Sequence, residues 1–592
     1  MRIRRRAGGR VTARPRVART TTAVLSLRNL AVSYPGGVQA LRGVSLEVAP
    51  GEIVGLVGES GAGKTVLGLA ALGLLPPSAE LDGHVFLGDT DMATATDEQR
   101  RIARKRFAGA VFQDPMTSLN PTMTVGRQVA EVTGSLAAAI EALERAHVPD
   151  ASRRAGQYPH ELSGGLRQRV MIAMAVAGAP ALIVADEPTT ALDVTVQAEI
   201  LRLLSELRDE TGSSILFVTH DLAVAAGLAD RVAVLYGGRL AEVGPTTELL
   251  QRPDHPYTGG LVAVRPSPDS PRGRPLPVLP GEPPDPRAHV DACPFAPRCP
   301  LVIPACEERL PQATAAPSHA GLVACVRAGE PQPSLVRVHD RFPDRAPTNG
   351  RPPALRLDDL SKAFGSRQFQ HVAVDGLTLE VPAGGAVALV GESGCGKTTT
   401  LRMAVGLQRP DSGTVAIGEG GRPQLVFQDA GASLTPWLSV GEHLEERLRS
   451  EGFTAPQRDE RAREVLALVG LPISVLGLRA RQLSGGQRQR VAIARAIAVP
   501  PALLACDEPI SSLDVSLAGA VLNLLCRLRA ELGMAMLFVT HDLSVARLVG
   551  DRVAVMHAGR IVEEGPPETV LDSPQHPQTR DLVASIPRLR SA

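Results

Sequence analysis

The sequence lacks a hydrophobic segment long enough to span a membrane. Its longest uncharged apolar stretch, residues 170–185, is interrupted by Gly178 and Pro180, whereas a membrane helix needs about 20 consecutive apolar residues. We interpret this stretch as the end of a helix, a turn and a buried strand. If the protein works at a membrane, other chains must supply the channel.

Lysine is also scarce, with four lysines against 59 arginines, and aromatic residues make up only 3% of the chain. The lysines are Lys64, Lys105, Lys362 and Lys397. Lys64 and Lys397 occupy the same position in two glycine-rich segments. Because arginine fills nearly every other basic position, this repeated lysine indicates a site that needs a compact ammonium group and not a planar guanidinium.

Charge is nearly balanced over the 592 residues, with 63 basic and 62 acidic side chains. Eight arginines lie within residues 1–20, where there is no acidic residue. We expect residues 1–23 to form a basic, disordered tail; binding to anionic lipid and an organelle presequence are the alternatives. We assign no function to this tail.

One set of motifs occurs twice in the chain and in the same order. A chance match to a single motif is common, but a repeated ordered series predicts two paralogous domains. The pairs are GESGAGKT at 58–65 and GESGCGKT at 391–398, LSGG at 162–165 and 483–486, DEP at 186–188 and 507–509, and THD at 219–221 and 540–542.

Each copy of the series has the strand and helix pattern of an α/β domain. Period-two apolar patterns at 24–30 and 44–48 precede a strand that enters the first glycine-rich loop, and the pattern repeats at 355–360, 377–381 and 386–391. This order predicts a largely parallel core sheet. The stretches that precede the two LSGG motifs are predicted to be helical.

Proline marks the boundary between the copies, since 21 of the 49 prolines lie between residues 266 and 353. Proline fixes φ and removes a backbone donor, so we expect an extended or irregular linker without strands of a core sheet. The predicted divisions are the tail at 1–23, a first α/β domain at 24–267, the linker at 268–352 and a second α/β domain at 353–592.

The repeated glycine-rich segment is typical of a phosphate-binding loop. Between a strand and a helix, consecutive backbone N–H groups wrap the phosphates, and the lysine meets the β- and γ-phosphates. The predicted ATP-binding residues here are Gly58, Ser60, Gly61, Gly63, Lys64 and Thr65, and in the second copy Gly391, Ser393, Gly394, Gly396, Lys397 and Thr398.

Acidic residues and histidines follow apolar strands in both copies. Asp186 and Asp507 end such strands, where a carboxylate can hold Mg²⁺, and the next residues, Glu187 and Glu508, are candidate bases for the attacking water. An Asp-Glu pair alone would more often be a solvated strand end. His220 and His541 are placed to hydrogen-bond the γ-phosphate, with a structural histidine as the alternative.

These motifs resemble the ATP-binding cassette (ABC) superfamily over about residues 24–267 and 353–592. The LSGG signature ahead of the DEP motif is specific, because a bare phosphate loop occurs in many NTPases. The resemblance implies two tandem ABC domains, each with a RecA-like parallel-sheet core, an antiparallel β subdomain and a helical subdomain. It implies a head-to-tail sandwich in which each signature closes the ATP of the other half, so that Ser484, Gly485 and Gly486 face Lys64, and Ser163, Gly164 and Gly165 face Lys397.

The resemblance also assigns residues around the phosphates and the adenine. Gln113 and Gln428 match the glutamine that senses Mg²⁺ and the γ-phosphate, and the pairs 192–193 and 513–514 match a loop that connects the two sites. Tyr34 matches an aromatic that stacks on adenine and Phe364 is a weaker match; packed strand-end aromatics are the alternative. The implied Mg²⁺ ligands are Thr65, Gln113 and Asp186 in one site and Thr398, Gln428 and Asp507 in the other.

The two halves are not identical in length. The interval from Lys64 to Gln113 is longer than that from Lys397 to Gln428. We therefore expect the antiparallel subdomain of the second half, or the segment after it, to be trimmed. Both halves keep every motif, so we expect two competent hydrolysis sites.

The segments after each cassette resemble the C-terminal extension of the dipeptide/oligopeptide/nickel importer ATPases. In the first half these segments are HPYTGGL at 255–261, LPGEPP at 279–284 and CPFAPRCP at 293–300; in the second half, HPQTRDL at 576–582. The chain thus resembles a fusion of the two ATPase subunits of such an importer.

Four of the seven cysteines lie in the linker: Cys293, Cys299, Cys306 and Cys325. Their C-x5-C-x6-C-x18-C spacing differs from the paired C-x2-C of common zinc ribbons. Four thiolates can hold a [4Fe–4S] cluster, which the resemblance also implies. Zinc and free reduced thiols are the alternatives.

The predicted function is an ATPase subunit that energises import of peptides or related solutes, with ATP and Mg²⁺ as cofactors. The resemblance implies two membrane permeases and an extracytoplasmic solute-binding protein as partners, with no nucleic acid, and a peripheral position on the cytoplasmic face of the membrane. A tandem cassette ATPase acting on ribosomes or DNA is the alternative. Such proteins usually have a charged helical linker or large zinc-bearing insertions, whereas this linker is rich in proline.

Overall fold

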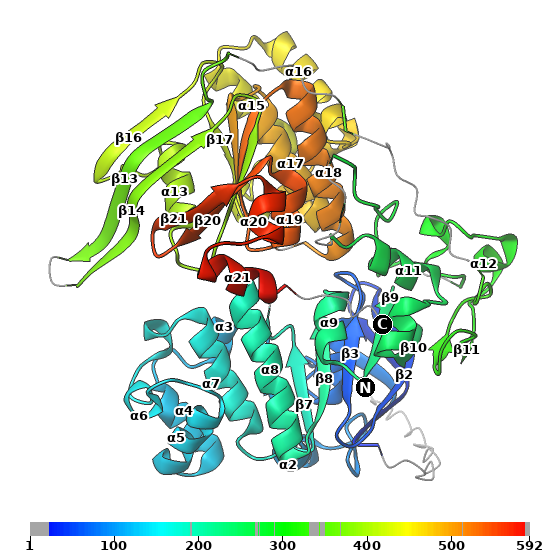
Figure 1. The fold of residues 1–592 in the computed structure, drawn as a ribbon. Helices are drawn as coiled ribbons and strands as arrows, with labels where there is room; N and C mark the ends of the chain where they lie inside the picture. Colours follow the sequence, from blue (N-terminus) through cyan, green and yellow to red (C-terminus); the bar gives the residue numbers. More distant parts are fainter. Residues whose placement is uncertain are drawn as a thin grey trace, which may run out of the picture.

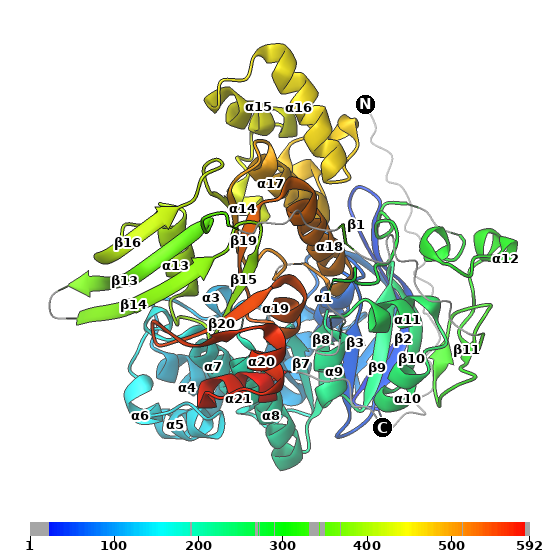
Figure 2. The same ribbon diagram turned by 45° about the horizontal axis from the view of Figure 1, so that its top comes forward.

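The two halves lie against each other, with a proline-rich segment at one side of the molecule. The computed structural model describes residues 23–189, 192–266, 270, 273–288, 291–330, 342–343, 350–366, 369–511 and 513–586. In Figure 1 the first half runs from blue to green and the second from yellow-green to red, and Figure 2 shows the same two halves turned by 45°. The predicted N-terminal tail, apart from its last residue, lies outside the described residues.

Each half contains a core sheet in which five parallel strands are followed by an antiparallel strand. In the first half the order is β6 (Ala108–Val111), β7 (Leu182–Asp186), β8 (Ser214–Thr219), β3 (Ile53–Val57), β9 (Arg231–Tyr236) and β10 (Arg239–Pro245). In the second it is β17 (Gln424–Val426), β18 (Leu503–Asp507), β19 (Ala535–Val539), β15 (Ala386–Val390), β20 (Arg552–His557) and β21 (Arg560–Gly565).

A separate antiparallel sheet accompanies each core. The first consists of β2 (Val38–Val48), β1 (Leu25–Tyr34), β4 (Glu80–Leu87) and β5 (Thr90–Asp91), and the second of β14 (Phe369–Val381), β13 (Leu355–Ser366) and β16 (Ser412–Ile417). Helix α2 (Asp97–Phe107) follows β5 in the first half, but no helix is assigned between β16 and β17. The shorter interval predicted for the second half therefore corresponds to the absence of a β5–α2 counterpart there.

Helices precede and follow the signature motifs, as the sequence predicts. Serine, threonine or aspartate side chains cap several of these helices; Ser484, for example, forms a capping box with Gln487, which satisfies otherwise unpaired backbone groups. The helices are α3 (Pro115–Ser118), α4 (Val125–Thr133), α5 (Leu136–Arg145), α6 (Ala151–Arg154), α7 (Gly164–Val176), α14 (Ala430–Ser433), α15 (Val440–Ser450), α16 (Ala455–Leu468) and α17 (Gly485–Ile497).

The remaining helices accompany the core strands along the chain. In the first half these are α1 (Lys64–Ala71), α8 (Val194–Thr211), α9 (Leu222–Leu228), α10 (Thr246–Gln251) and α11 (Pro256–Ala263). In the second half they are α13 (Lys397–Ala404), α18 (Val515–Leu532), α19 (Leu543–Val549), α20 (Pro567–Asp572) and α21 (Pro577–Ala584).

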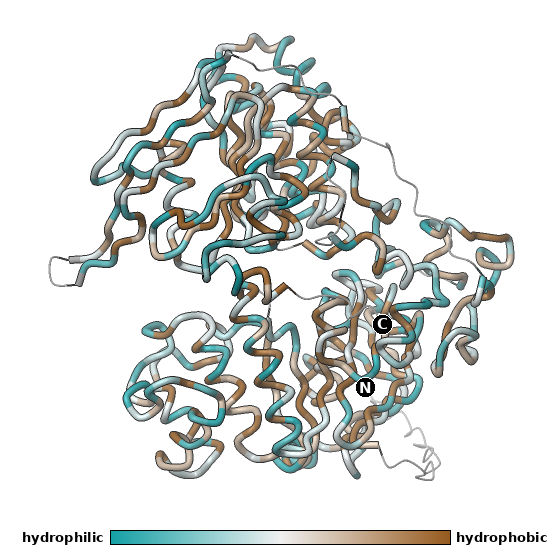
Figure 3. Tube along the Cα trace, in the orientation of Figure 1, coloured by the Kyte–Doolittle hydropathy of each residue, from teal (hydrophilic) through white to brown (hydrophobic). Residues whose placement is uncertain are grey.

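Alternate residues of the first core strands bury themselves on opposite faces of the sheet. Ile53 and Phe217 join residues of α7 and α8 in one cluster, whereas Val54 and Leu216 join residues of α1 and the antiparallel sheet in another. This is the three-layer arrangement expected for a sheet buried on both faces. Hydrophobic residues accordingly concentrate inside the two halves in Figure 3.

Within the described part of the chain, no helix combines the length and the apolar character needed to cross a bilayer.

The linker contains more regular structure than its prolines predict. It forms a 3₁₀ turn, η2 (Ala296–Arg298), helix α12 (Pro304–Glu308) and strands β11 (Thr314–Ala315) and β12 (Leu322–Val323). Strand β12 pairs with β10, so the first core sheet gains two strands. The expectation that the linker lacks strands of the core sheet is therefore wrong at these positions, because both short strands are free of proline and keep their backbone donors.

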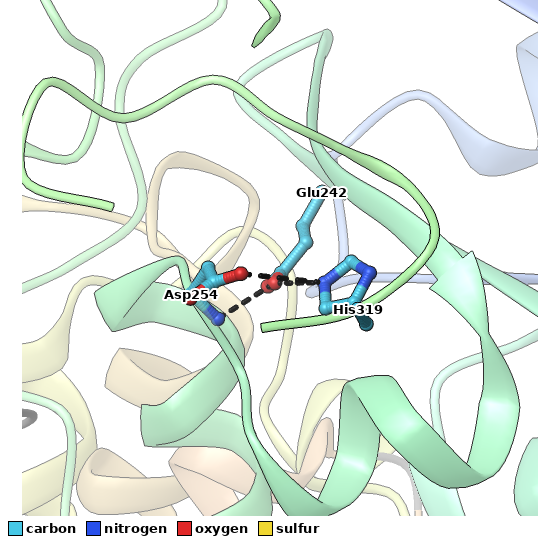
Figure 4. A group of neighbouring side chains, drawn as sticks. All are labelled: Glu242, Asp254 and His319. Carbon is cyan, nitrogen blue, oxygen red and sulfur yellow. Dashed lines mark hydrogen bonds and ion pairs between the residues drawn. The ribbon is translucent and has the colours of Figure 1, made fainter. Parts of the chain in front are cut away.

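A buried histidine anchors this linker to the first cassette. His319 Nε2 lies 2.8 Å from Glu242 Oε1 of β10 and 3.9 Å from Asp254 Oδ2, and all three side chains are at most 1% exposed (Figure 4). The Asp254 and His255 N–H groups donate to the Glu242 carboxylate at 2.7 and 3.2 Å. The second half keeps the corresponding backbone bonds, from Gln575 and His576 to Glu563.

We expect His319→Ala to loosen the contact between β10 and β12, because it leaves the buried Glu242 carboxylate without its imidazole partner, at a cost of about 1–3 kcal/mol. Hydrogen–deuterium exchange should show faster exchange in β12, with β20 and β21 unchanged as an internal control. His319→Gln retains a donor and should give a smaller effect. Equal protection of β12 in all three proteins would show that His319 is not an anchor.

Candidate functional site

Each glycine-rich loop is folded around its own lysine. Lys64 Nζ donates to the carbonyl oxygens of Gly58 and Glu59 at 2.8 and 3.1 Å, and Lys397 Nζ makes the same contacts with Gly391 and Glu392 at 2.7 Å each. Both lysines are 6% exposed. Burial is the largest influence on Lys64 and lowers its pKa, against the opposing effect of nearby carboxylates. A phosphate bound in the loop would place its negative charge next to these buried ammonium groups and so offset the cost of burying them.

Glycine is required where the loops turn into their helices. Gly63 and Gly396 precede α1 and α13 with φ of 101° and 110°, and neither helix has a side-chain cap. A Cβ at Gly63 would lie 2.5 Å from the Ala40 carbonyl oxygen, and one at Gly396 would lie 2.1 Å from that of Ala373. The uncapped N–H groups at the start of each helix are suited to bind an anion.

A hydroxyl and a carboxylate meet at the edge of each loop. Thr65 Oγ1 donates to Asp186 Oδ1 at 3.3 Å, and Thr398 Oγ1 donates to Asp507 Oδ1 at 3.1 Å. Burial is the main cause that raises the pKa of both aspartates. These oxygens are of the type that Mg²⁺ prefers, and a bound cation would offset the cost of burying the carboxylates.

The two candidate bases have an unusual backbone conformation. Glu187 and Glu508 have φ of 46° and 43°, in the left-handed region that residues with a Cβ rarely adopt. Their N–H groups donate to Val218 and Val539 of the neighbouring strands at 2.9 and 3.1 Å, which holds this conformation. The same conformation occurs at the corresponding position of both halves, and strained backbone of this kind is common at functional sites.

A glutamine and a histidine contact each of these glutamates. Gln113 Nε2 donates to Glu187 Oε2 at 3.2 Å, and His220 Nδ1 lies 3.3 Å from the same oxygen. The second half repeats this with Gln428 at 3.4 Å and His541 at 3.2 Å from Glu508 Oε2. The structure thus brings together the glutamine, glutamate and histidine predicted from separate motifs.

The histidine–glutamate contact changes the pKa values of its members. Burial lowers the pKa of His220 and of His541, but the hydrogen bond and charge of the adjacent glutamate outweigh it, so both pKa values are raised. Burial acts to raise the pKa of Glu508, yet the hydrogen bond and charge of His541 leave it lowered. Both shifts favour a protonated imidazole next to an ionised carboxylate.

An aspartate of each half contacts the phosphate loop of the other. The Ser393 N–H donates to Asp193 Oδ2 at 3.2 Å, and the Ser60 N–H donates to Asp514 Oδ2 at 3.4 Å. These aspartates also cap α8 and α18. They belong to the segments that the sequence matched to a connecting loop, and the structure shows that this connection crosses between the halves.

Both candidate ATP pockets are lined by residues of both halves. The first contains Lys64, Thr65, Gln113 and Glu187 together with Leu513 and Asp514 of the second half. The second contains Lys397, Thr398, Gln428 and Glu508 together with Leu192 and Asp193 of the first. The candidate adenine contacts Tyr34 and Phe364 also line the first and the second pocket, respectively.

The signature residues lie at helix starts outside both pockets. Ser163 caps α7 and Ser484 caps α17, and the glycine pairs 164–165 and 485–486 form the first residues of these helices. None of these residues lines either pocket. The closed sandwich therefore remains a prediction for the ATP-bound protein.

The four linker cysteines line a single cavity. Cys293, Cys299, Cys306 and Cys325 surround it together with His255, Phe295 and other residues. Burial raises the pKa of Cys325 to about 11. The backbone hydrogen bond from Arg327 acts to lower this pKa, and the neighbouring thiols act to raise it. Within the described residues, the group of metal-type ligand atoms found within 4.8 Å of one another is Glu242, Asp254 and His319, which includes none of these sulfurs.

Comparison with known families agrees with this architecture. The family model "ABC transporter" matches residues 41–190 and 374–511, and "Oligopeptide/dipeptide transporter, C-terminal region" matches residues 241–306 and 562–592. The oligopeptide transport ATP-binding protein OppD of Mycobacterium tuberculosis is 41% identical over 95% of this chain and 98% of its own length. The chain belongs to the ABC transporter ATP-binding proteins.

Other relatives match nearly the whole length of this chain. The glutathione import ATP-binding proteins GsiA of Salmonella typhimurium and Escherichia coli are each 37% identical to this chain. The matches cover 94% and 95% of this chain and 88% and 89% of those relatives. The fold prediction of two tandem ABC domains is confirmed, and the chain is an ABC ATPase.

Sequence reasoning missed one group next to the first ABC site. Arg298, between two of the linker cysteines, forms a buried ion pair with Glu59 of the first phosphate loop at 2.6 Å. Pro286 of the linker also lines the first pocket. A cationic residue within the CPFAPRC segment was the available signal, but nothing local in the sequence identifies a partner so distant along the chain.

We expect the His541–Glu508 contact to stabilise the protein more at mildly acidic than at alkaline pH. Because the folded pKa of His541 is raised, its contribution is complete below the unfolded pKa of about 6.5 and is lost as pH rises through the folded pKa. The difference in Tm between wild type and His541→Gln, measured without nucleotide, should therefore shrink as pH rises above about 6.5. In a Glu508→Gln background this pH dependence should disappear; its persistence there would refute the pairing.

Proposed function

We propose that this chain is the ATP-hydrolysing component of an importer for peptides or related solutes and supplies both of its cassettes. The cassettes would span residues 24–267 and 353–592, joined by the linker at 268–352. The observation that carries the proposal is the pair of pockets. Each is lined by the lysine, threonine, glutamine, glutamate and histidine of one set of motifs and by the aspartate loop of the opposite half. The importer-type C-terminal region in both halves supports the class of transport.

In the first site, hydrolysis would begin with attack of a water molecule on the γ-phosphorus of ATP and break the bond to the ADP oxygen. We assign Glu187 as the base that accepts the water proton. His220 would orient Glu187 and contact the γ-phosphate, and Lys64 would contact the β- and γ-phosphates. The corresponding residues of the second site are Glu508, His541 and Lys397.

Magnesium fits the oxygen atoms next to each phosphate loop. When bound, Mg²⁺ neutralises charge on the phosphate oxygens. We assign its ligands to Thr65, Gln113 and Asp186 in the first site and to Thr398, Gln428 and Asp507 in the second. The serine and two glycines of each signature, at 163–165 and 484–486, would close on the ATP of the opposite half, where helix N-termini favour the phosphates.

The cycle of closing and reopening would drive other chains. We propose two integral-membrane permeases as partners, with an extracytoplasmic solute-binding protein delivering the solute, and a position on the cytoplasmic face of the membrane. The relatives are named for oligopeptide transport and glutathione import, which supports peptide-like solutes.

A [4Fe–4S] cluster held by Cys293, Cys299, Cys306 and Cys325 is part of this proposal. The cavity that all four line supports it. Within the described residues, no three of these sulfurs lie within 4.8 Å of one another. When bound, a [4Fe–4S] cluster would hold the four thiolates together.

We expect Glu187→Gln and Glu508→Gln each to lower ATP turnover by about 10² or more, because each removes the base of one site and the two sites act together. Turnover should be measured on the chain in detergent with its co-purified membrane partners, alongside the double variant. A single substitution that leaves turnover unchanged would show that its site is not a hydrolysis site. Co-purification with ribosomes or DNA in place of permeases would contradict the transport assignment.

We expect the anaerobically purified chain to contain about four iron and four sulfide per molecule. Cys299→Ser and Cys325→Ser should lose most of both, measured by metal and acid-labile sulfide analysis. Cys526→Ser, in the buried face of α18, is the matched control and should retain them. Stoichiometric zinc, or no metal in the anaerobic protein, would refute the cluster.

A further inference from the structure

A buried ion pair connects the cysteine-bearing linker to the first phosphate loop. Arg298 Nη1 lies 2.6 Å from Glu59 Oε2, and Arg298 Nη2 donates to Glu59 Oε1 at 3.0 Å. The two side chains are 4% and 2% exposed. This two-point geometry fixes the orientation of the carboxylate as well as neutralising it.

The guanidinium group is itself held in place by its surroundings. Its Nε donates to the Pro280 carbonyl oxygen at 2.7 Å, and Nη1 donates to the Tyr236 hydroxyl at 3.1 Å. The rings of Tyr236 and Phe295 lie within 6.0 Å of its central carbon. Arg298 therefore has a defined position that depends on the fold of the linker, since Pro280, Phe295 and Arg298 all belong to it.

The same glutamate contacts the second half. The Ser516 hydroxyl, at the start of α18, hydrogen-bonds to Glu59 Oε1 and lies 2.8 Å from Asp514 Oδ1. Asp514 in turn accepts the Ser60 N–H of the first phosphate loop. Two buried carboxylates thus flank one hydroxyl, an arrangement that needs a cation on the Glu59 side to be stable.

Among the described residues, the second ATP site has no equivalent arrangement. Its glutamate, Glu392, is 36% exposed, with His557 Nδ1 3.9 Å away. It accepts a hydrogen bond from the neutral amide of Gln578 at 2.7 Å. Thr195, at the position that corresponds to Ser516, donates to its own Asp193 at 2.6 Å. The paralogous halves therefore offer an internal comparison for the function of Arg298.

We propose that Arg298 is a positioning residue for the first ATP site. It fixes the Glu59 carboxylate, which holds Ser516 and with it the Asp514 loop of the second half against the first phosphate loop. The first site consequently depends on the linker for its cross-half contact, whereas the second site does not. This inference rests on the proposed assignment of the two ATP sites.

The test is a double-mutant cycle on ATP hydrolysis by the full chain with its membrane partners. Arg298→Gln and Ser516→Ala should each lower kcat, by about tenfold for Arg298→Gln, while KM for MgATP changes little because neither side chain lines the pocket. The double variant should stay within about twofold of Arg298→Gln, since both changes break the same connection. Arg298→Lys, which keeps the charge but loses the two-point contact, should recover part of kcat.

The matched control is a second cycle, in which Thr195 of the first half is substituted and Ser516 is left unchanged. The effects of Arg298→Gln and Thr195→Val should multiply, because Thr195 serves the second site. If Arg298→Gln does not fold, as judged by thermal melting, the cycle with Arg298→Lys carries the test. The proposal would be overturned if the effects of the Arg298 and Ser516 substitutions on kcat multiplied. It would also be overturned if kcat were unchanged or if only KM changed. A wild-type chain without ATPase activity would instead refute the proposed function.

Discussion

The aspartate that caps the helix after each DEP motif accepts a backbone N–H from the phosphate loop of the opposite half, and the geometry of both ATP sites depends on this exchange. Asp193 accepts a hydrogen bond from the Ser393 N–H, and Asp514 accepts one from the Ser60 N–H. Neither half can complete a pocket alone, because each pocket contains residues of the other. A change in how the halves sit against each other therefore alters both sites at once, which is the physical basis for coupling hydrolysis to a movement.

The two sites share their chemistry but differ in what supports them. The lysine, aspartate, glutamate and histidine contacts agree closely between the halves. The glutamate of the first loop, Glu59, is buried and paired with Arg298, whereas that of the second, Glu392, is partly exposed and paired with an amide. The same candidate catalytic side chains thus have different neighbours in the two sites, so matching motifs do not imply matching regulation.

The sequence predicted what is encoded by neighbouring residues. The strand–loop–helix pattern around Lys64 and Lys397 specified the phosphate loops, and the trimmed second half followed from the spacing between Lys397 and Gln428. What it did not predict are contacts between distant segments: the β12 strand that joins β10, the burial of His319 on Glu242, and the pair formed by Arg298 and Glu59. These depend on tertiary proximity and leave no periodicity or local spacing in the chain.

The linker does more than join the cassettes along the chain, because its backbone is bound to the second half. Leu276 donates to and accepts from the side chain of Asn523 of α18, at 2.8 and 2.9 Å. Each first cassette is consequently paired with a second cassette at a high effective concentration set by the tether. Separately made subunits could pair as two identical copies and would dissociate on dilution. A single chain fixes the ratio at one of each and makes assembly of the ATPase core independent of protein concentration.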